Sequence, residues 1–310
     1  MASVYDLCLL ASAVYDTDNG AVAGESEQWV AQMPSGNPKS GFYSVFFLRG
    51  NEGVLSIRGT DFTQGSDLGA DIQLAVGSVP HQFANADRAF ADAYKLNKNR
   101  PMYVTGHSLG GGLASLLAAK HGLPTVTFNA PGMMRSRASA LGGPSPTAIT
   151  VTAMGMINPG MMYAPGIMPI MGTTPNEVFD QVKQRQAAQN KAAQIDTSKM
   201  LNIRAADDVV SVATGAAIGR VETIVVPRTG VDAGLGVAQM ISPAMTLLGA
   251  PWHAFQQHRI ANVLGVIKNT PKYKSDLRWL PAPQPVQPPK PVIPGQRKHT
   301  RSEERRVGKE

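Results

Sequence analysis

The stretch from Tyr103 to Ala114 reads YVTGHSLGGGLA and holds the pattern Gly-x-Ser-x-Gly around Ser108. Strand-forming residues precede the serine and a helix-forming run follows it, so the chain is expected to turn abruptly at this point. Gly106 and Gly110 supply the small neighbours that such a turn needs. Amides at the start of the helix would face developing negative charge. The pattern therefore predicts a nucleophile elbow with Ser108 at its tip.

Two other glycine-rich loops fit this stretch less well. A Walker loop ends in Gly-Lys-Ser/Thr, and the first lysine after Ser108 is Lys120. A dinucleotide-binding loop needs Gly-x-Gly-x-x-Gly, and the glycines at 106, 110, 111 and 112 have a different spacing. The serine is thus a better candidate for chemistry than for holding a phosphate.

The sequence around the elbow predicts an α/β fold. Patterns typical of strands cover residues 41–50, 53–61, 102–106, 124–132, 201–210 and 220–227, and helical patterns cover 109–122 and 259–269. The first two strands are joined by Asn-Glu-Gly and should form a hairpin. A strand, a helix and a strand follow one another from 102 to 132, and this βαβ unit predicts a sheet that is at least partly parallel.

The segments VTGHSLGGGLA and LSIRGTD together resemble the class 3 lipase family of α/β-hydrolases, of the bacterial type. The resemblance runs from about Gly41 to Leu264 and is weakest across an insertion. It implies an α/β-hydrolase fold with a mostly parallel central sheet, a nucleophile elbow and an insertion or cap region. It also implies a serine carboxylester hydrolase of lipase or esterase type that acts on lipid or other hydrophobic esters and needs no cofactor. In that family the residue after Arg-Gly donates to the oxyanion. Thr60 holds that position here, and the backbone amide of Leu109 would be the second donor.

A serine nucleophile needs a histidine that removes its proton and an acid that orients the histidine. In this fold the three follow the chain order serine, acid, histidine. Since His299 lies in the tail, His253 and His258 are left as candidate bases. His258 is preferred, because a helical pattern starts immediately after it and the family places its histidine ahead of the last core helix.

The acid of the triad likewise has two adjacent candidates. Asp207 and Asp208 both lie near the end of the strand pattern at 201–210. Asp208 is preferred because Asp-Val-Val-Ser aligns better with the family's pattern. Adjacent side chains at a strand end point to different sides, so Asp207 is expected to be solvated. Asp232 fits the chain order but no motif. The predicted catalytic set is therefore Ser108, Asp208 and His258.

The predicted domain organisation is one lipase-like domain over 1–280, with an insertion at about 133–200. Residues 155–172 are rich in methionine, glycine and proline, which favours either a cap that touches acyl chains or an irregular excursion packed on the body. Residues 176–194 have helical composition. A proline-rich tail or linker should cover 281–300, and 301–310 is expected to be a disordered tail or an artefact of sequence assembly.

Composition narrows the function classes. The formal net charge of +7 arises from 29 basic and 22 acidic residues, and 281–310 supply +4 of it. The rest of the chain has no basic stripe with interleaved aromatics, so a nucleic-acid partner is not expected. No apolar run reaches the roughly 20 residues of a transmembrane helix, and no metal-ligand cluster is visible. Cys8 is the single cysteine and is expected to be a buried apolar side chain.

The N-terminal segment MASVYDLCLLASAVYD lacks a basic region, and Asp6 interrupts its apolar run. It predicts an amphipathic helix rather than a signal peptide, and so a cytoplasmic protein or one exported by a leaderless route. The predicted partner is a lipid or hydrophobic ester, with transient contact to a lipid interface. Two alternatives stay open: a phospholipase exported as an antibacterial effector, and a non-catalytic binding module that keeps the hydrolase fold.

Overall fold

The computed structural model describes residues 1–16, 28–59, 79–97, 99–134, 136–143, 175–208, 210–211, 214–227 and 258–275. Its centre is a seven-stranded sheet in which the strands lie in chain order. The strands are β1 (Val30–Asn37), β2 (Phe42–Arg49), β3 (Glu52–Ile57), β4 (Met102–His107), β5 (Thr125–Phe128), β6 (Met200–Ala205) and β7 (Arg220–Ile224). The first three are antiparallel to one another, and β3 to β7 run parallel.

The sheet confirms the predicted hairpin and the predicted βαβ unit. The hairpin joins β2 to β3 through Gly50, whose φ of 52° lies in the left-handed region that glycine tolerates. Strand β1 was not predicted. Pro34 lies within it, and a proline fits a strand only at an edge, where its missing N–H costs no ladder hydrogen bond.

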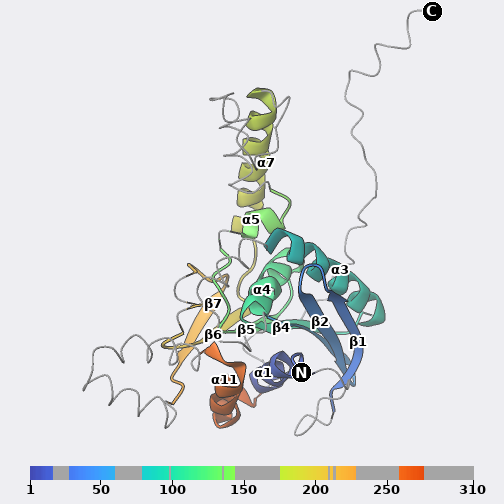
Figure 1. Cartoon of the computed structure of the whole chain (residues 1–310), viewed down its shortest axis with the longest axis vertical. Helices are drawn as coiled ribbons and strands as arrows, with labels where there is room; N and C mark the ends of the chain where they lie inside the picture. Colours follow the sequence, from blue (N-terminus) through green and yellow to red (C-terminus); the bar gives the residue numbers. More distant parts are fainter. Residues whose placement is uncertain are drawn as a thin grey trace, which may run out of the picture.

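Helices cover both faces of the sheet (Figure 1). On one face lie α1 (Val4–Ala13) and α11 (Ile260–Lys268), which pack against each other. On the other face lie α3 (Val79–Asn97) and α4 (Leu109–His121). The crossovers from β3 to β4 and from β4 to β5 both pass over this second face. The result is a three-layer α/β arrangement.

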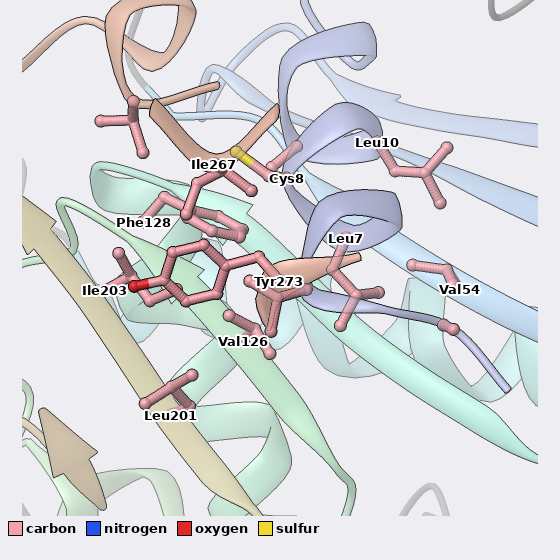
Figure 2. Packing of buried hydrophobic residues seen from close by; sticks show 14 of the residues in the cluster. Leu7, Cys8, Leu10, Val54, Val126, Phe128, Leu201, Ile203, Ile267 and Tyr273 are labelled. Carbon is pink, nitrogen blue, oxygen red and sulfur yellow. The ribbon is translucent and has the colours of Figure 1, made fainter. Parts of the chain in front are cut away.

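Alternation along the strands sends side chains into two separate cores. On β4, Tyr103 joins the core under α1 and α11, while Met102 and Val104 join the core under α4. Figure 2 shows the first core, where side chains of α1, β5, β6 and α11 meet. Cys8 lies there fully buried, and burial raises the pKa of its thiol well above the usual value. The predicted structural role of this cysteine agrees with that burial.

The predicted N-terminal helix is confirmed as α1. Ser3 caps it, because its hydroxyl accepts a hydrogen bond from the amide of Asp6 while the Asp6 carboxylate accepts from the amide of Ser3. The same carboxylate accepts from Trp29 and pairs with Arg49 at 2.8 Å. None of residues 2–15 is exposed, so α1 is covered on all sides rather than amphipathic.

Helix α3 was not predicted, although its apolar residues recur at helical spacing. Phe83, Ala86, Phe90 and Ala93 are all buried against the sheet and α4. Alanines make up half of this stripe, which weakens the contrast between its two faces.

Three further elements of the described structure are α5 (Arg137–Ala140), α7 (Pro175–Ala193) and the 3-10 helix η4 (Pro271–Tyr273). Helix α7 confirms the helical composition predicted for 176–194, and it extends from α5 away from the sheet (Figure 1). Residues 155–172 and the tail 281–310 lie outside the described residues. The assignment of 1–280 to one domain stays a prediction.

Candidate active site

The nucleophile elbow lies between β4 and α4. Ser108 has φ 55° and ψ −135°, and it is fully buried. A Cβ on Gly106 would lie 2.6 Å from the carbonyl of Gly110, and one on Gly110 would lie 2.1 Å from the carbonyl oxygen of Ile57. Both glycines of Gly-x-Ser-x-Gly are therefore required by backbone approach, as the sequence predicted.

The chain that follows β3 lies directly against this turn. A Cβ on Gly59 would approach the Cβ of Ser108 to 3.0 Å and the carbonyl oxygen of His107 to 2.6 Å. Only glycine at position 59 lets the chain after β3 come this close to the serine. Thr60, the predicted oxyanion donor, lies outside the described residues.

Three side chains from distant parts of the chain form a continuous hydrogen-bonded row. The Nε2 atom of His258 lies 2.8 Å from Oγ of Ser108. Its Nδ1 atom lies 2.8 Å from Oδ1 of Asp208. Since an ionised carboxylate only accepts hydrogen bonds, Nδ1 carries a hydrogen and Nε2 is the acceptor for the serine hydroxyl. In this tautomer the histidine can remove the serine proton.

Asp208 is fully buried three residues after the end of β6, whereas Asp207 is exposed. Burial opposes ionisation of Asp208, but hydrogen bonds from His258 and Ser211 outweigh it and lower the pKa of this carboxyl. The amide of Ser211 donates to Oδ2 at 3.1 Å. The acid is thus a carboxylate at neutral pH, with each oxygen engaged by a donor.

His258 is buried and lies two residues before α11. It is this histidine that meets Ser108. The alternatives His253 and Asp232 lie outside the described residues. Leu109 is the first residue of α4, so its amide has no carbonyl partner inside the helix. That position suits the predicted second oxyanion donor.

Three side chains that were not predicted from the sequence form hydrogen bonds that support this site. Ser211 supports Asp208, and Asn129 donates from Nδ2 to the carbonyl oxygen of His258 at 3.1 Å. The hydroxyl of Tyr15 lies 3.0 Å from Nδ1 of His107, a residue for which the sequence predicted packing alone. Of these three residues, only Asn129 has a local signal. It directly follows β5 with a φ of 47°, a region that asparagine tolerates.

No group of three or more His, Cys, Asp or Glu side chains among the described residues is arranged to bind a metal ion. In the same part of the chain, no helix is both long enough and apolar enough to cross a bilayer.

A mostly parallel sheet, a strained serine on a strand–turn–helix, and a histidine and an aspartate that follow it in the chain define the class of α/β-hydrolases. The fold class predicted from the sequence is confirmed.

Comparisons with known proteins point to lipase-like relatives. The model of the Tle-like phospholipase domain, a phospholipase-like family, matches residues 7–149, which is less than half of the chain. That segment contains Gly59 and Ser108 and ends before Asp208 and His258. The class 3 and bacterial assignments stay predictions.

Curated relatives match over short segments. A protein of Vanderwaltozyma polyspora named "Putative lipase ATG15" is 38% identical over 61 residues, which is 20% of this chain and 11% of that protein. Its namesake from Lodderomyces elongisporus is 67% identical over 33 residues, 11% of this chain and 6% of that protein. The chain therefore covers only about a tenth of the length of these relatives or less.

Solved structures are similar at low identity. Lipase II from Rhizopus niveus has a TM-score of 0.34 at 12% identity, over 67% of this chain and 72% of that one. The native propeptide complex of the Rhizomucor miehei lipase has a TM-score of 0.30 at 16% identity, over 42% of this chain and 51% of that one.

Proposed function

We propose that this protein is a serine-dependent carboxylic ester hydrolase of lipids, with Ser108 as nucleophile, His258 as base and Asp208 as orienting acid. The observation that supports the proposal best is the pair of 2.8 Å contacts from the two ring nitrogens of His258 to Ser108 and Asp208. Lipid esters are the proposed substrates because the family model and the curated relatives named above are lipase-like.

The reaction proceeds by two acyl transfers. The Oγ atom of Ser108 attacks the ester carbonyl as Nε2 of His258 takes the hydroxyl proton, which forms a tetrahedral oxyanion. The amide of Leu109 and Thr60 are the proposed donors to that oxyanion. When the oxyanion collapses, the ester bond breaks, His258 returns its proton to the leaving alcohol, and the acyl group stays on Ser108.

Water completes the cycle. His258 removes a proton from the water, which attacks the acyl-enzyme, and then returns the proton to Oγ of Ser108 as the fatty acid leaves. Asp208 stays ionised throughout and stabilises the imidazolium that forms in each half-reaction. Its low pKa and its hydrogen bond to Nδ1 suit this role.

The nucleophile is tested by Ser108→Ala assayed on p-nitrophenyl esters of several chain lengths, with covalent labelling by a fluorophosphonate as a second readout. Loss of the nucleophile should lower kcat about a million-fold and abolish labelling. Ser115→Ala is the matched control, since Ser115 is a buried serine further along α4 that contacts Asn202. Turnover and labelling of the Ser108→Ala protein at the wild-type level would refute the proposal.

The acid is tested by the neighbouring pair Asp208→Asn and Asp207→Asn. The first replacement turns the carboxylate into a neutral amide that no longer fixes the tautomer of His258, and it should lower kcat about ten-thousand-fold. The second alters an exposed residue beside it and should leave kcat within about twofold, because exposed substitutions away from a site have small effects. The assignment fails if Asp207→Asn is the inactive variant of the two.

A phospholipid substrate is the second candidate, and the match to the Tle-like phospholipase domain is the observation that favours it. Fatty-acid release from phosphatidylcholine vesicles and from a triacylglycerol emulsion, measured side by side, separates the two substrate classes. Export and an antibacterial role stay predictions from the sequence, as does the position of the predicted cap.

A further inference from the structure

The histidine that precedes the nucleophile joins two parts of the site that lie far apart in the sequence. His107 is only 5% exposed, and both of its ring nitrogens have partners. Nε2 lies 2.6 Å from the carbonyl oxygen of His258, and Nδ1 lies 3.0 Å from the hydroxyl of Tyr15. This side chain therefore hydrogen-bonds to the backbone of the proposed base, and its ring also lies against the His258 imidazole, with ring centroids 4.9 Å apart.

The partners of His107 determine where its proton resides. Burial, followed by repulsion from His258, lowers the pKa of His107 to about 3, so the ring is neutral at neutral pH. A neutral imidazole has one donor and one acceptor, and a carbonyl oxygen can only accept. Nε2 therefore donates to the His258 carbonyl, and Nδ1 accepts from the Tyr15 hydroxyl.

The Tyr15 hydroxyl has a second partner next to the elbow. Its oxygen accepts a hydrogen bond from the amide of Gly59 at 3.1 Å. Gly59 immediately precedes Thr60, the proposed oxyanion donor. One hydroxyl at the C-terminal end of α1 thus connects the segment after β3 with His107 and, through it, with His258.

The carbonyl of His258 receives two side-chain donors. Nε2 of His107 donates to it at 2.6 Å and Nδ2 of Asn129 donates at 3.1 Å. The amides of Asn262 and Val263, in the first turn of α11, bond to the carbonyl of Arg259. The side chains of His107 and Asn129 thus hold the His258 backbone just ahead of α11.

We propose that Tyr15, His107 and Asn129 form a positioning network that fixes the backbone of His258 and of Gly59 relative to Ser108. The inference rests on the proposed hydrolase function. Both ring nitrogens of His107 bond to groups other than the reacting atoms, so it is a positioning residue. A shift of about 1 Å in a catalytic group can cost about a hundredfold in rate, and two donors on one carbonyl limit such a shift.

Two replacements of His107 separate its two hydrogen bonds. Glutamine carries its amide nitrogen at the ε position, so His107→Gln keeps a donor for the His258 carbonyl and loses the acceptor for Tyr15. Asparagine carries its amide at the δ position, so His107→Asn keeps a partner for Tyr15 and loses the donor to His258. Each variant gives up one hydrogen bond, so their melting temperatures should be similar.

The network predicts unequal kcat values from this pair. On a soluble p-nitrophenyl ester, His107→Asn should lower kcat by about tenfold to a hundredfold with KM unchanged, while His107→Gln should stay within about threefold of wild type. The rate of fluorophosphonate labelling of Ser108 should follow the same order. A role in folding alone would lower both variants equally, so equal kcat values overturn the proposal.

Tyr15→Phe is the second variant, since it removes one hydroxyl and keeps the ring. It should lower kcat about threefold to tenfold, because both Gly59 and His107 lose a partner. If neither His107 variant folds, an unchanged kcat in Tyr15→Phe overturns the proposal. Failure of the underlying function has a different signature, in which Ser108→Ala retains activity and labelling. If activity depends on Ser108 but kcat is equal in the two His107 variants, only the network is refuted.

Discussion

Ser108 has a backbone conformation that costs a non-glycine residue about 1–3 kcal/mol and persists only where the surroundings hold it. Its amide donates to the carbonyl of Phe128 on β5, and its own carbonyl accepts from the amide of Gly112 in α4. The strained turn is thus bonded to the strand on one side and to the helix on the other. The strain directs Oγ toward His258.

Close packing at the elbow can be tested with two glycines of α4. A Cβ at position 110 would lie 2.1 Å from the carbonyl oxygen of Ile57, which is backbone that cannot easily move. A Cβ at position 112 would meet Cε of Met133 at 2.3 Å, the flexible end of a side chain. Gly110→Ala should therefore destabilise the protein by about 1–3 kcal/mol, even though alanine favours a helix.

Gly112→Ala is the matched control and should change the free energy of unfolding by less than about 1 kcal/mol, because the gain in helix propensity offsets the shift of Met133. Urea denaturation of both variants measures the difference. A loss of stability that is as large for Gly112→Ala as for Gly110→Ala would contradict the packing argument.

Among the elements, α1 contacts both the sheet and a second helix. It packs on β4 and β5 through one side and on α11 through another, and its N-terminus holds the group of Asp6, Trp29 and Arg49. Tyr15, just after its last turn, belongs to the positioning network. Tyr15, distant in sequence from every proposed catalytic residue, thus contacts His107 and Gly59, which adjoin Ser108 and Thr60.

The N-cap of α1 should contribute stability without affecting catalysis. Ser3→Ala removes the hydroxyl that accepts from the Asp6 amide and should lower the free energy of unfolding by about 1 kcal/mol. Ser12→Ala, in the same helix but without a cap to lose, should lie within about 0.5 kcal/mol of wild type. Thermal unfolding monitored by circular dichroism measures both. Equal melting temperatures for the two variants would show that the cap contributes nothing.

For the whole molecule, one buried histidine links stability to pH. The pKa of His107 is about 3 in the folded protein, against 6.5 for an ordinary histidine. Between these values the unfolded chain binds a proton that the folded one excludes, so stability is complete above about pH 6.5 and falls as the pH falls toward 3. The loss is up to about 1.4 kcal/mol per pH unit in this window.

Urea denaturation at a series of pH values measures this loss, and His107→Gln provides the reference because glutamine does not titrate. The stability of the variant should depend less steeply on pH between about 6.5 and 3. Curves of equal slope for the two proteins would mean that His107 is protonated in the folded state.

The elbow, the hairpin and the parallel strands could be predicted because each is encoded by residues next to one another. The choice of Asp208 over Asp207 followed from motif alignment, and the contact with His258 agrees with it. Strand β1 was missed because Pro34 argues against a strand unless its place at the sheet edge is known.

The support of the site could not be predicted in the same way. Tyr15 lies 92 positions before His107, and Asn129 lies 129 positions before His258. Such contacts follow from how α1, β5 and α11 pack on the sheet, and no local pattern of residues records that packing. The residues proposed to carry out the chemistry lie in recognisable motifs, whereas those proposed to position them do not.

The order of the elements along the chain has a consequence for synthesis. The elbow and the strands beside it are complete within the first part of the polypeptide, but the proposed base lies 150 residues after the nucleophile and just ahead of α11. Helix α1 is synthesised before α11 and stays uncovered on one side until α11 emerges and packs on it. The proposed hydrolytic activity therefore cannot arise until the proposed base has been synthesised and α11 has packed.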